Sequence, residues 1–115
     1  MNRRLNVSIL EVVGSPFCVA SDDGQRVFER LQAALTQQAS VTVSFRNVSN
    51  LTSAFLNSAI GQLYGIFSVD EIRSRLRVTE IEPDDRALLK RVVQTAKAYF
   101  QDPERFERAA KDALA

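Results

Sequence analysis

Two hydroxyl residues, Thr52 and Ser53, stand where a strand-like segment gives way to a helix in the stretch VTVSFRNVSNLTSAFLNSAIGQLYG (41–65). A serine becomes a nucleophile when a neighbouring base, usually histidine, takes its proton. The chain contains no histidine, so it cannot build a Ser-His or Cys-His pair or use imidazole as a metal ligand. Two uses remain for Ser53: to cap the first turn of the helix, or to accept a phosphate, which would add nearly two negative charges to any surface docked there.

The other groups that could do chemistry have structural interpretations. Asp22-Asp23 and Asp84-Asp85 are the paired carboxylates, and a hard cation binds such oxygens. Both pairs fall in the first turn of an expected helix, where carboxylates accept backbone N–H bonds and complement the helix dipole. Cys18, in the apolar run FCVA, is expected to be a small buried hydrophobe. No glycine-rich phosphate-binding loop occurs, and we therefore expect no catalytic activity, no metal ion and no cofactor.

The composition is typical of a soluble globular domain. The chain has 115 residues, of which 45% are apolar and 25% charged, which predicts one domain over residues 1–115. The net charge of +1 gives no basic field for nucleic acid. The N-terminal apolar run is too polar for a signal peptide, and no stretch is long enough to span a bilayer. With a single cysteine, we expect a cytoplasmic protein that binds neither nucleic acid nor membrane.

Strand and helix patterns alternate along the chain, which predicts an α/β fold. Ser21 or Asp22 is expected to cap the first long helix, and with Asp22 as cap Gln25 falls at the capping-box position. A last amphipathic helix over about 103–115 is expected as an appendage packed on the body. The other expected elements are a strand over 5–13, a helix over about 22–37, a strand over 41–45, a helix over 51–67, a short helix capped by Ser68, a strand over 77–82 and a helix from Pro83 to about 101.

The central helix has two distinct faces at 100° per residue. One face is apolar and is expected to cover the sheet; it comprises residues 55, 56, 59, 60, 63, 66 and 67. The other is a stripe of small residues, Ala54, Ser58, Gly61 and Gly65, flanked by Asn57 and Tyr64. The two glycines cost about 2 kcal/mol of helix propensity relative to alanine, so we expect close packing there. The packed element is expected to be the following helix of this chain, with a second protein as the alternative.

Four segments carry a resemblance to a known family. They are DDGQRVFERL (22–31), VTVSFRNVSNLTSAFLNSAIGQLYG (41–65), FSVDEIRSRL (67–76) and LLKRVVQTAKAYF (88–100). Together they resemble STAS domains, the fold of bacterial anti-sigma factor antagonists, and more closely a STAS-like family of small proteins without an established function. The resemblance implies a mixed β-sheet backed by helices on one side, and a non-catalytic switch or adaptor in the bacterial cytoplasm.

The resemblance also implies a role for Ser53. In the antagonists this helix begins with an Asp-Ser-Ser/Thr-Gly type motif, whose serine is phosphorylated by a partner of the histidine-kinase-like ATPase superfamily. Aligned on the strand end and the helix, the motif positions are occupied by Thr52, Ser53, Ala54 and Phe55. Thr52 in place of aspartate and Phe55 in place of glycine are departures. The resemblance thus implies Ser53 as phosphoacceptor candidate and such an ATPase, or another regulator, as partner.

These observations predict a regulatory domain that works by binding another protein. The expected partner surface is the start of the central helix with the neighbouring loop, namely Asn50, Thr52, Ser53, Asn57, Ser58, Asp22 and Asp23. Two other functions stay open. One is a small-molecule or nucleotide pocket at the same helix start, where free N–H groups attract anions; the other is simple homo-oligomerisation, for example as a homodimer.

Overall fold

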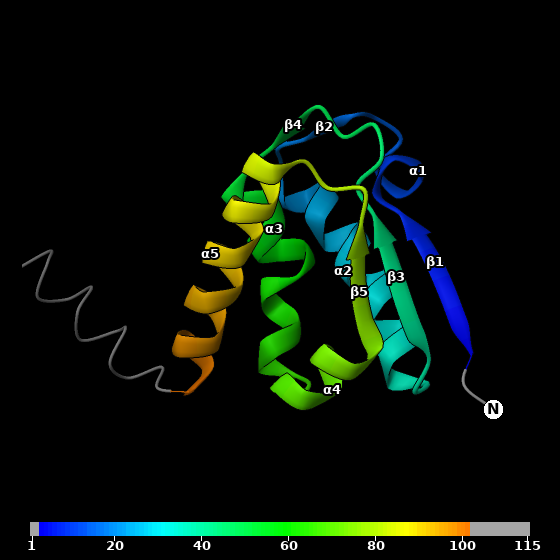
Figure 1. Cartoon of the computed structure of the whole chain (residues 1–115), viewed down its shortest axis with the longest axis vertical. Coiled ribbons are helices and arrows are strands. Elements are labelled where there is room, and N and C mark those ends of the chain that lie inside the picture. The colour runs from blue at the N-terminus through cyan, green and yellow to red at the C-terminus, as the bar shows by residue number, and fades with distance from the viewer. Residues whose placement is uncertain (1–2, 102–115) are drawn as a thin grey trace, which may run out of the picture.

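The main sheet has three strands, all parallel. The computed structural model describes residues 3–101 (Figure 1). The strands β1 (Arg4–Ser8), β3 (Ser40–Ser44) and β5 (Leu76–Thr79) lie in the order β1-β3-β5. A second, two-stranded sheet joins β2 (Phe17–Cys18) to β4 (Asn50–Leu51), again in parallel. The predicted α/β class is confirmed. The sheet differs from the expected mixed one because helices connect its strands, and such crossovers bring the next strand back in parallel.

Helices cover one face of the main sheet. They are α2 (Ser21–Thr36), α3 (Ser53–Ala59), α4 (Val69–Arg75) and α5 (Pro83–Gln101), with a 3-10 helix, η1 (Gly61–Gly65), after α3 (Figure 1). Strand β3 shows the two faces directly, since Val41 and Val43 are buried while Ser40, Thr42 and Ser44 are only half-buried. The apolar core therefore lies between the sheet and these helices.

Residues 9–13 form a helix instead of the second half of the expected strand. Ser8 caps this short helix, α1 (Ile9–Val13), by accepting a hydrogen bond from the Glu11 N–H at 3.2 Å. Gly14 ends it in the left-handed conformation with φ of 79°, which glycine adopts without steric cost. The strand prediction was wrong here because the apolar run ILEVV fits a buried strand and a buried helical turn equally well.

The central helix is broken at Ile60. The prediction of one helix over 51–67 was wrong, because α3 ends at Ala59 and the chain continues as η1 after Ile60 leaves helical geometry at φ of −122°. Ile66, expected in the core, is 52% exposed. The rest of the expected apolar face is confirmed as buried for Phe55, Leu56, Ala59, Ile60 and Leu63 and as half-buried for Phe67.

Other expected elements agree with the structure. Helix α2, strand β3 and helix α5 are confirmed within one or two residues. Ser68 caps α4 in a full capping box with Glu71. The cap of α2 differs, because Ala20 is its N-cap and Asp22 lies one residue inside the helix. Strand β5 ends at Thr79, earlier than expected. The helix expected over about 103–115 falls outside the residues that the structure describes.

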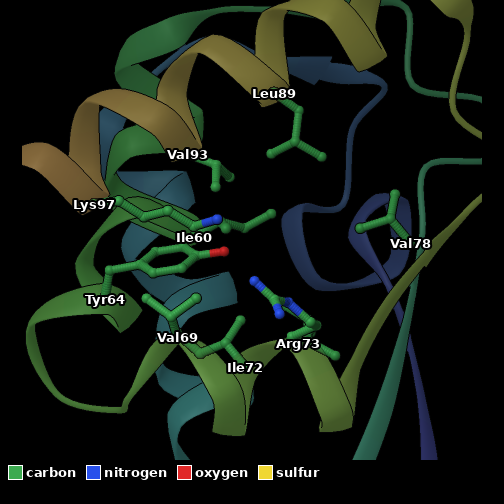
Figure 2. A pocket seen from close by; sticks show the side chains of 10 residues that line it. Ile60, Tyr64, Val69, Ile72, Arg73, Val78, Leu89, Val93 and Lys97 are labelled. Carbon is green, nitrogen blue, oxygen red and sulfur yellow. The ribbon is translucent and has the colours of Figure 1, made fainter.

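Helix α5 covers the two glycines of the stripe of small residues. A Cβ added to Gly61 would lie 3.7 Å from the Ala96 Cβ and 3.8 Å from the Val92 Cγ1. At Gly65 an added Cβ would lie 2.5 Å from the Phe100 ring. The packed element is thus a helix of the same chain, as expected, but it is α5 and not the following helix, α4; the rest of the stripe is not covered by α5, because Ser58 contacts α2 and Ala54 is exposed. Below this contact, α5, α4, η1 and β5 surround a pocket (Figure 2).

Candidate functional site

Thr52 fixes the start of α3. Its hydroxyl accepts a hydrogen bond from the Phe55 N–H at 3.2 Å and donates one to the Val19 carbonyl at 2.7 Å. Its backbone N–H donates to the Cys18 carbonyl at 3.2 Å. Thr52 therefore serves as helix cap and ties α3 to the strand β2 through both side chain and backbone.

Ser53 is the first residue of α3, and its side chain is exposed. Its hydroxyl forms no hydrogen bond with any group in residues 3–101, so the capping use falls to Thr52. Ser53 borders a groove of about 300 Å³ between α3 and α5, whose other lining residues include Asn57 and Arg91. The groove thus contains the Ser53 hydroxyl and the exposed residue Arg91.

The start of α2 lies against the middle of α3. The Ser58 hydroxyl donates to the Ser21 carbonyl at 2.8 Å, and Gln62 Nε2 donates to the Ser58 carbonyl, also at 2.8 Å. Ser58 is half-buried in this contact. Of the expected partner surface, Ser58 therefore joins two helices, whereas Asn57, one residue earlier, is exposed in the groove with Ser53.

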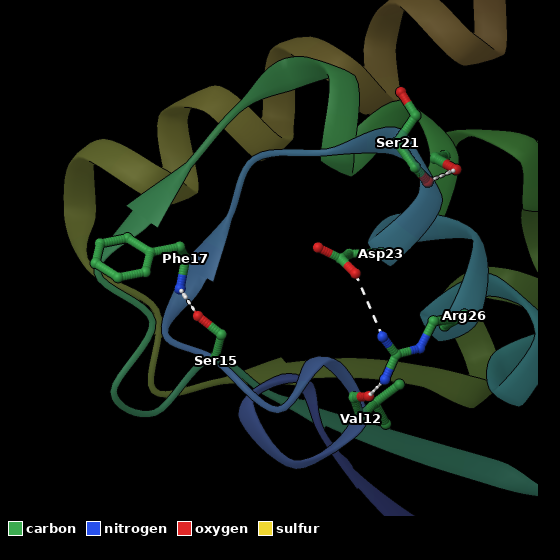
Figure 3. A network of polar contacts seen from close by, with 7 residues as sticks. Val12, Ser15, Phe17, Ser21, Asp23 and Arg26 are labelled. Carbon is green, nitrogen blue, oxygen red and sulfur yellow. Dashed lines mark hydrogen bonds and ion pairs between the residues drawn. The ribbon is translucent and has the colours of Figure 1, made fainter.

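Asp22 and Asp23 lie in different surroundings. Asp23 pairs with Arg26 at 3.3 Å, and Arg26 also donates to the Val12 carbonyl at the end of α1 (Figure 3). Asp23 is thus engaged on the α1 side of α2. Asp22 is exposed in the first turn of the helix. The structure brings Ser53 and Asn57 together and leaves Asp23 out of that group.

Two exposed apolar residues of this region were not expected. Phe17 is 57% exposed and pairs in register with Asn50, while Val19 is 47% exposed and accepts the Thr52 hydrogen bond. Cys18 between them is buried, as expected, and its burial, with a smaller effect of the Asp23 charge, raises the pKa of the thiol to about 11. Successive side chains of a strand point to opposite faces, so a buried Cys18 could have predicted that Phe17 and Val19 are exposed.

Residues 23–86 match the family model described as a STAS-like domain of unknown function (DUF4325). The chain belongs to this family. The match confirms the resemblance, and it covers α2, β3, α3 and β5 in this STAS-like domain, including Ser53 and Asn57. Arg91, Phe17 and Val19 lie outside the matched residues.

No curated protein and no solved structure gives a significant match. Among the described residues of the STAS-like domain, no helix is both long and apolar enough to cross a membrane.

Proposed function

We propose that this STAS-like domain is a non-catalytic regulatory module that binds a protein partner, and that phosphorylation of Ser53 controls the binding. The observation that carries the proposal is the exposed Ser53 hydroxyl, which makes no hydrogen bond within residues 3–101 and lies in one groove with Arg91. A serine that the fold uses would be bonded, as Thr52 is.

Apolar side chains next to Ser53 support a docking role for this surface. Phe17 lies on the strand that pairs with β4, and Thr52, the residue before Ser53, is hydrogen-bonded to Val19. Aromatic side chains such as that of Phe17 are enriched in protein interfaces, and Val19 extends the exposed apolar surface beside it. Asn50 and Asn57 provide polar groups around them. The proposed surface therefore combines an apolar anchor, a polar rim and one site of modification.

A phosphate on Ser53 would change the charge of this surface sharply. It carries nearly two negative charges and three strong acceptor oxygens at neutral pH, and Arg91 offers a fork of donors suited to such an anion. Apolar groups of a docked partner would then have to pack against a hydrated phosphate, which should weaken the binding. The kinase we propose is an ATPase of the histidine-kinase-like type, because that enzyme modifies the aligned serine in the STAS antagonists.

The test begins with affinity purification of the full chain from its native host and identification of the partner by mass spectrometry. Binding of the partner is then measured for the parent, Ser53→Asp and Ser53→Asn. Aspartate and asparagine have nearly the same shape, so their difference isolates the charge. We expect Ser53→Asp to bind at least about tenfold more weakly than Ser53→Asn, which corresponds to about 1.4 kcal/mol.

Melting temperatures of the three proteins provide the stability control. They should agree to within the shift caused by the roughly 0.3–1 kcal/mol that a carboxylate gains in the first turn of a helix, since Ser53 is exposed and makes no bond that either substitution removes. Equal binding of the aspartate and asparagine variants would refute the switch at this residue. Incubation of the parent with the recovered ATPase and ATP should also place a phosphate on Ser53, located by peptide mass spectrometry.

A further inference from the structure

The pocket below α5 has an apolar body. It encloses about 200 Å³ and is bounded by α4, α5, η1 and β5 (Figure 2). Apolar side chains reach it from each side, among them Ile72 on α4, Val78 on β5 and Leu89 and Val93 on α5. Such a lining favours a ligand that has an apolar part, because burying that part in the pocket removes it from water.

Three polar groups converge on this apolar body. Figure 2 shows the Tyr64 hydroxyl, the Lys97 amine and the Arg73 guanidinium directed into the same space from η1, α5 and α4. The Lys97 Nζ lies 5.8 Å from the centre of the Tyr64 ring, within the range of a cation–π contact. Two cations and a hydroxyl therefore meet at one end of an apolar pocket.

The positive charges there have no anionic partner in the described part of the chain. No carboxylate of residues 3–101 lies within ion-pair distance of Arg73 or Lys97. The Tyr64 hydroxyl likewise has no hydrogen-bond partner within those residues. Burial raises the pKa of Tyr64, and the Arg73 charge offsets this only in part, so the hydroxyl stays protonated at neutral pH and can donate. All three groups can donate a hydrogen bond, and none of them has an acceptor within hydrogen-bond distance in residues 3–101.

We propose that this pocket binds a small amphipathic organic acid, with its carboxylate held by Arg73, Lys97 and the Tyr64 hydroxyl and its hydrocarbon part in the apolar body. The three donors match the acceptor-only chemistry of an ionised carboxylate. An amine ligand would meet two like charges, and a neutral ligand could form only uncharged acceptor contacts, which are weaker with these cations than those of a carboxylate.

The volume limits the size of the acid. At about 30 Å³ for each water-sized group, 200 Å³ holds roughly seven such groups. That is less than the roughly 300 Å³ at which sites for drug-sized ligands begin. The pocket therefore suits an acid of roughly seven to eight non-hydrogen atoms, such as hexanoate, and the last carbons of the longer octanoate would extend from its mouth. A nucleotide is too large for it.

The first experiment compares head groups on one hydrocarbon chain by titration calorimetry with the full-length protein. Octanoate, 1-octanol and octylamine share their apolar part and differ in charge. We expect octanoate to bind with a stoichiometry of one, octanol at least about tenfold more weakly and octylamine not at all. Octanol binding as tightly as octanoate, or absence of octanoate binding at millimolar concentration, would overturn the proposal.

The second experiment uses matched charge variants. Arg73→Gln should weaken octanoate binding at least about tenfold, the effect of one lost charge-assisted hydrogen bond. Arg77→Gln is the control, because Arg77 is exposed on β5 and alternates with Leu76 and Val78, which line the pocket. Equal effects of the two variants would mean that only net charge matters and would refute the site.

A charge reversal separates folding from recognition. Arg73 is exposed, so Arg73→Glu should keep the parent's melting temperature, lose octanoate binding and gain octylamine binding. Octylamine failing to bind this folded variant would contradict the proposed head-group position.

The pocket and the groove at Ser53 are lined by different residues, so failure here leaves the proposal for Ser53 standing, and the reverse also holds.

Discussion

Gly24 is the point of closest approach between α2 and α3, and its replacement by alanine is the most direct test of how the candidate site is built. The residue is buried in the first turns of α2. A Cβ at this position would lie 2.5 Å from the Phe55 carbonyl oxygen, 2.8 Å from the Ser58 Cβ and 3.2 Å from the Ala59 nitrogen. Two of these atoms belong to the backbone of α3 and cannot rotate away. The helices must therefore move apart to admit a methyl group.

Two opposing effects set the size of the change. Alanine gains about 1 kcal/mol over glycine in helix propensity. Overpacking of a well-packed contact costs about 1–3 kcal/mol, and the backbone contact at 2.5 Å places Gly24→Ala at the upper end. We expect a net loss of about 1–2 kcal/mol, which for a domain of this size lowers the melting temperature by roughly 4–8 °C.

Gly61→Ala is the matched control. Its added Cβ would meet Asn57 Oδ1 at 3.5 Å and no other atom closer than 3.7 Å, which is ordinary contact. We expect unchanged or slightly higher stability. Both variants are compared with the parent by far-UV circular dichroism during thermal and urea unfolding. A Gly24→Ala protein as stable as Gly61→Ala would refute the close packing of α2 on α3.

Two further predictions concern the residues next to this contact. Thr52→Ala should cost about 1–2 kcal/mol in urea unfolding because it removes the cap and the bond to Val19, while Ser53→Ala should cost less than about 0.5 kcal/mol; equal losses would contradict the assignment of the cap. The pKa of Cys18 is raised from 9.0 to about 11 by burial, so the unfolded thiol ionises first and the folded state should lose stability as the pH rises from about 9 to 11. Cys18→Ala should lack this component in urea unfolding at pH 8 and pH 10, and an unchanged pH dependence would show that the thiol does not cause it.

Local patterns in the sequence were sufficient to predict the elements whose structure depends only on neighbouring residues. Helices α2 and α5 carry long apolar periodicities, which predicted both within one or two residues. Ser68 with Glu71 three positions later is a capping box, and the structure forms it. The glycines of the stripe of small residues likewise predicted close packing, and α5 packs on both of them. In each case the physical cause lies within one turn or one face of a helix.

The differences arose where distant segments decide the local structure. The run Ile9–Val13 became helical because β1 pairs with β3 over only five residues, and Ser8 and Gly14 then cap the turn that follows. No proline causes the break of the helix at Ile60. The two glycines that come after Ile60 permit a 3-10 turn, and this turn brings η1 against α5. No pattern in one helix could reveal this.

The candidate site was predictable only in part for the same reason. Ser53 and Asn57 lie four residues apart on one helix, and their common groove follows from that spacing. Arg91 reaches the same groove from α5, and the pocket at Tyr64 gathers side chains from η1, α4, β5 and α5. Such groups converge through tertiary packing, and a single sequence contains no direct signal of that convergence.

The parallel pairing of the main sheet also constrains how the chain can fold. Arg4 lies opposite Ser40, and Val41 lies opposite Leu76, so each pair closes a segment of more than thirty residues and none of them can start as a local hairpin. The entropy lost on closing such a segment must be offset while it forms. Helix α2 lies within the first segment and α3, η1 and α4 within the second, so strand pairing and helix docking have to occur together. We therefore expect the α2–α3 contact, on which the candidate site is built, to form together with the sheet during folding.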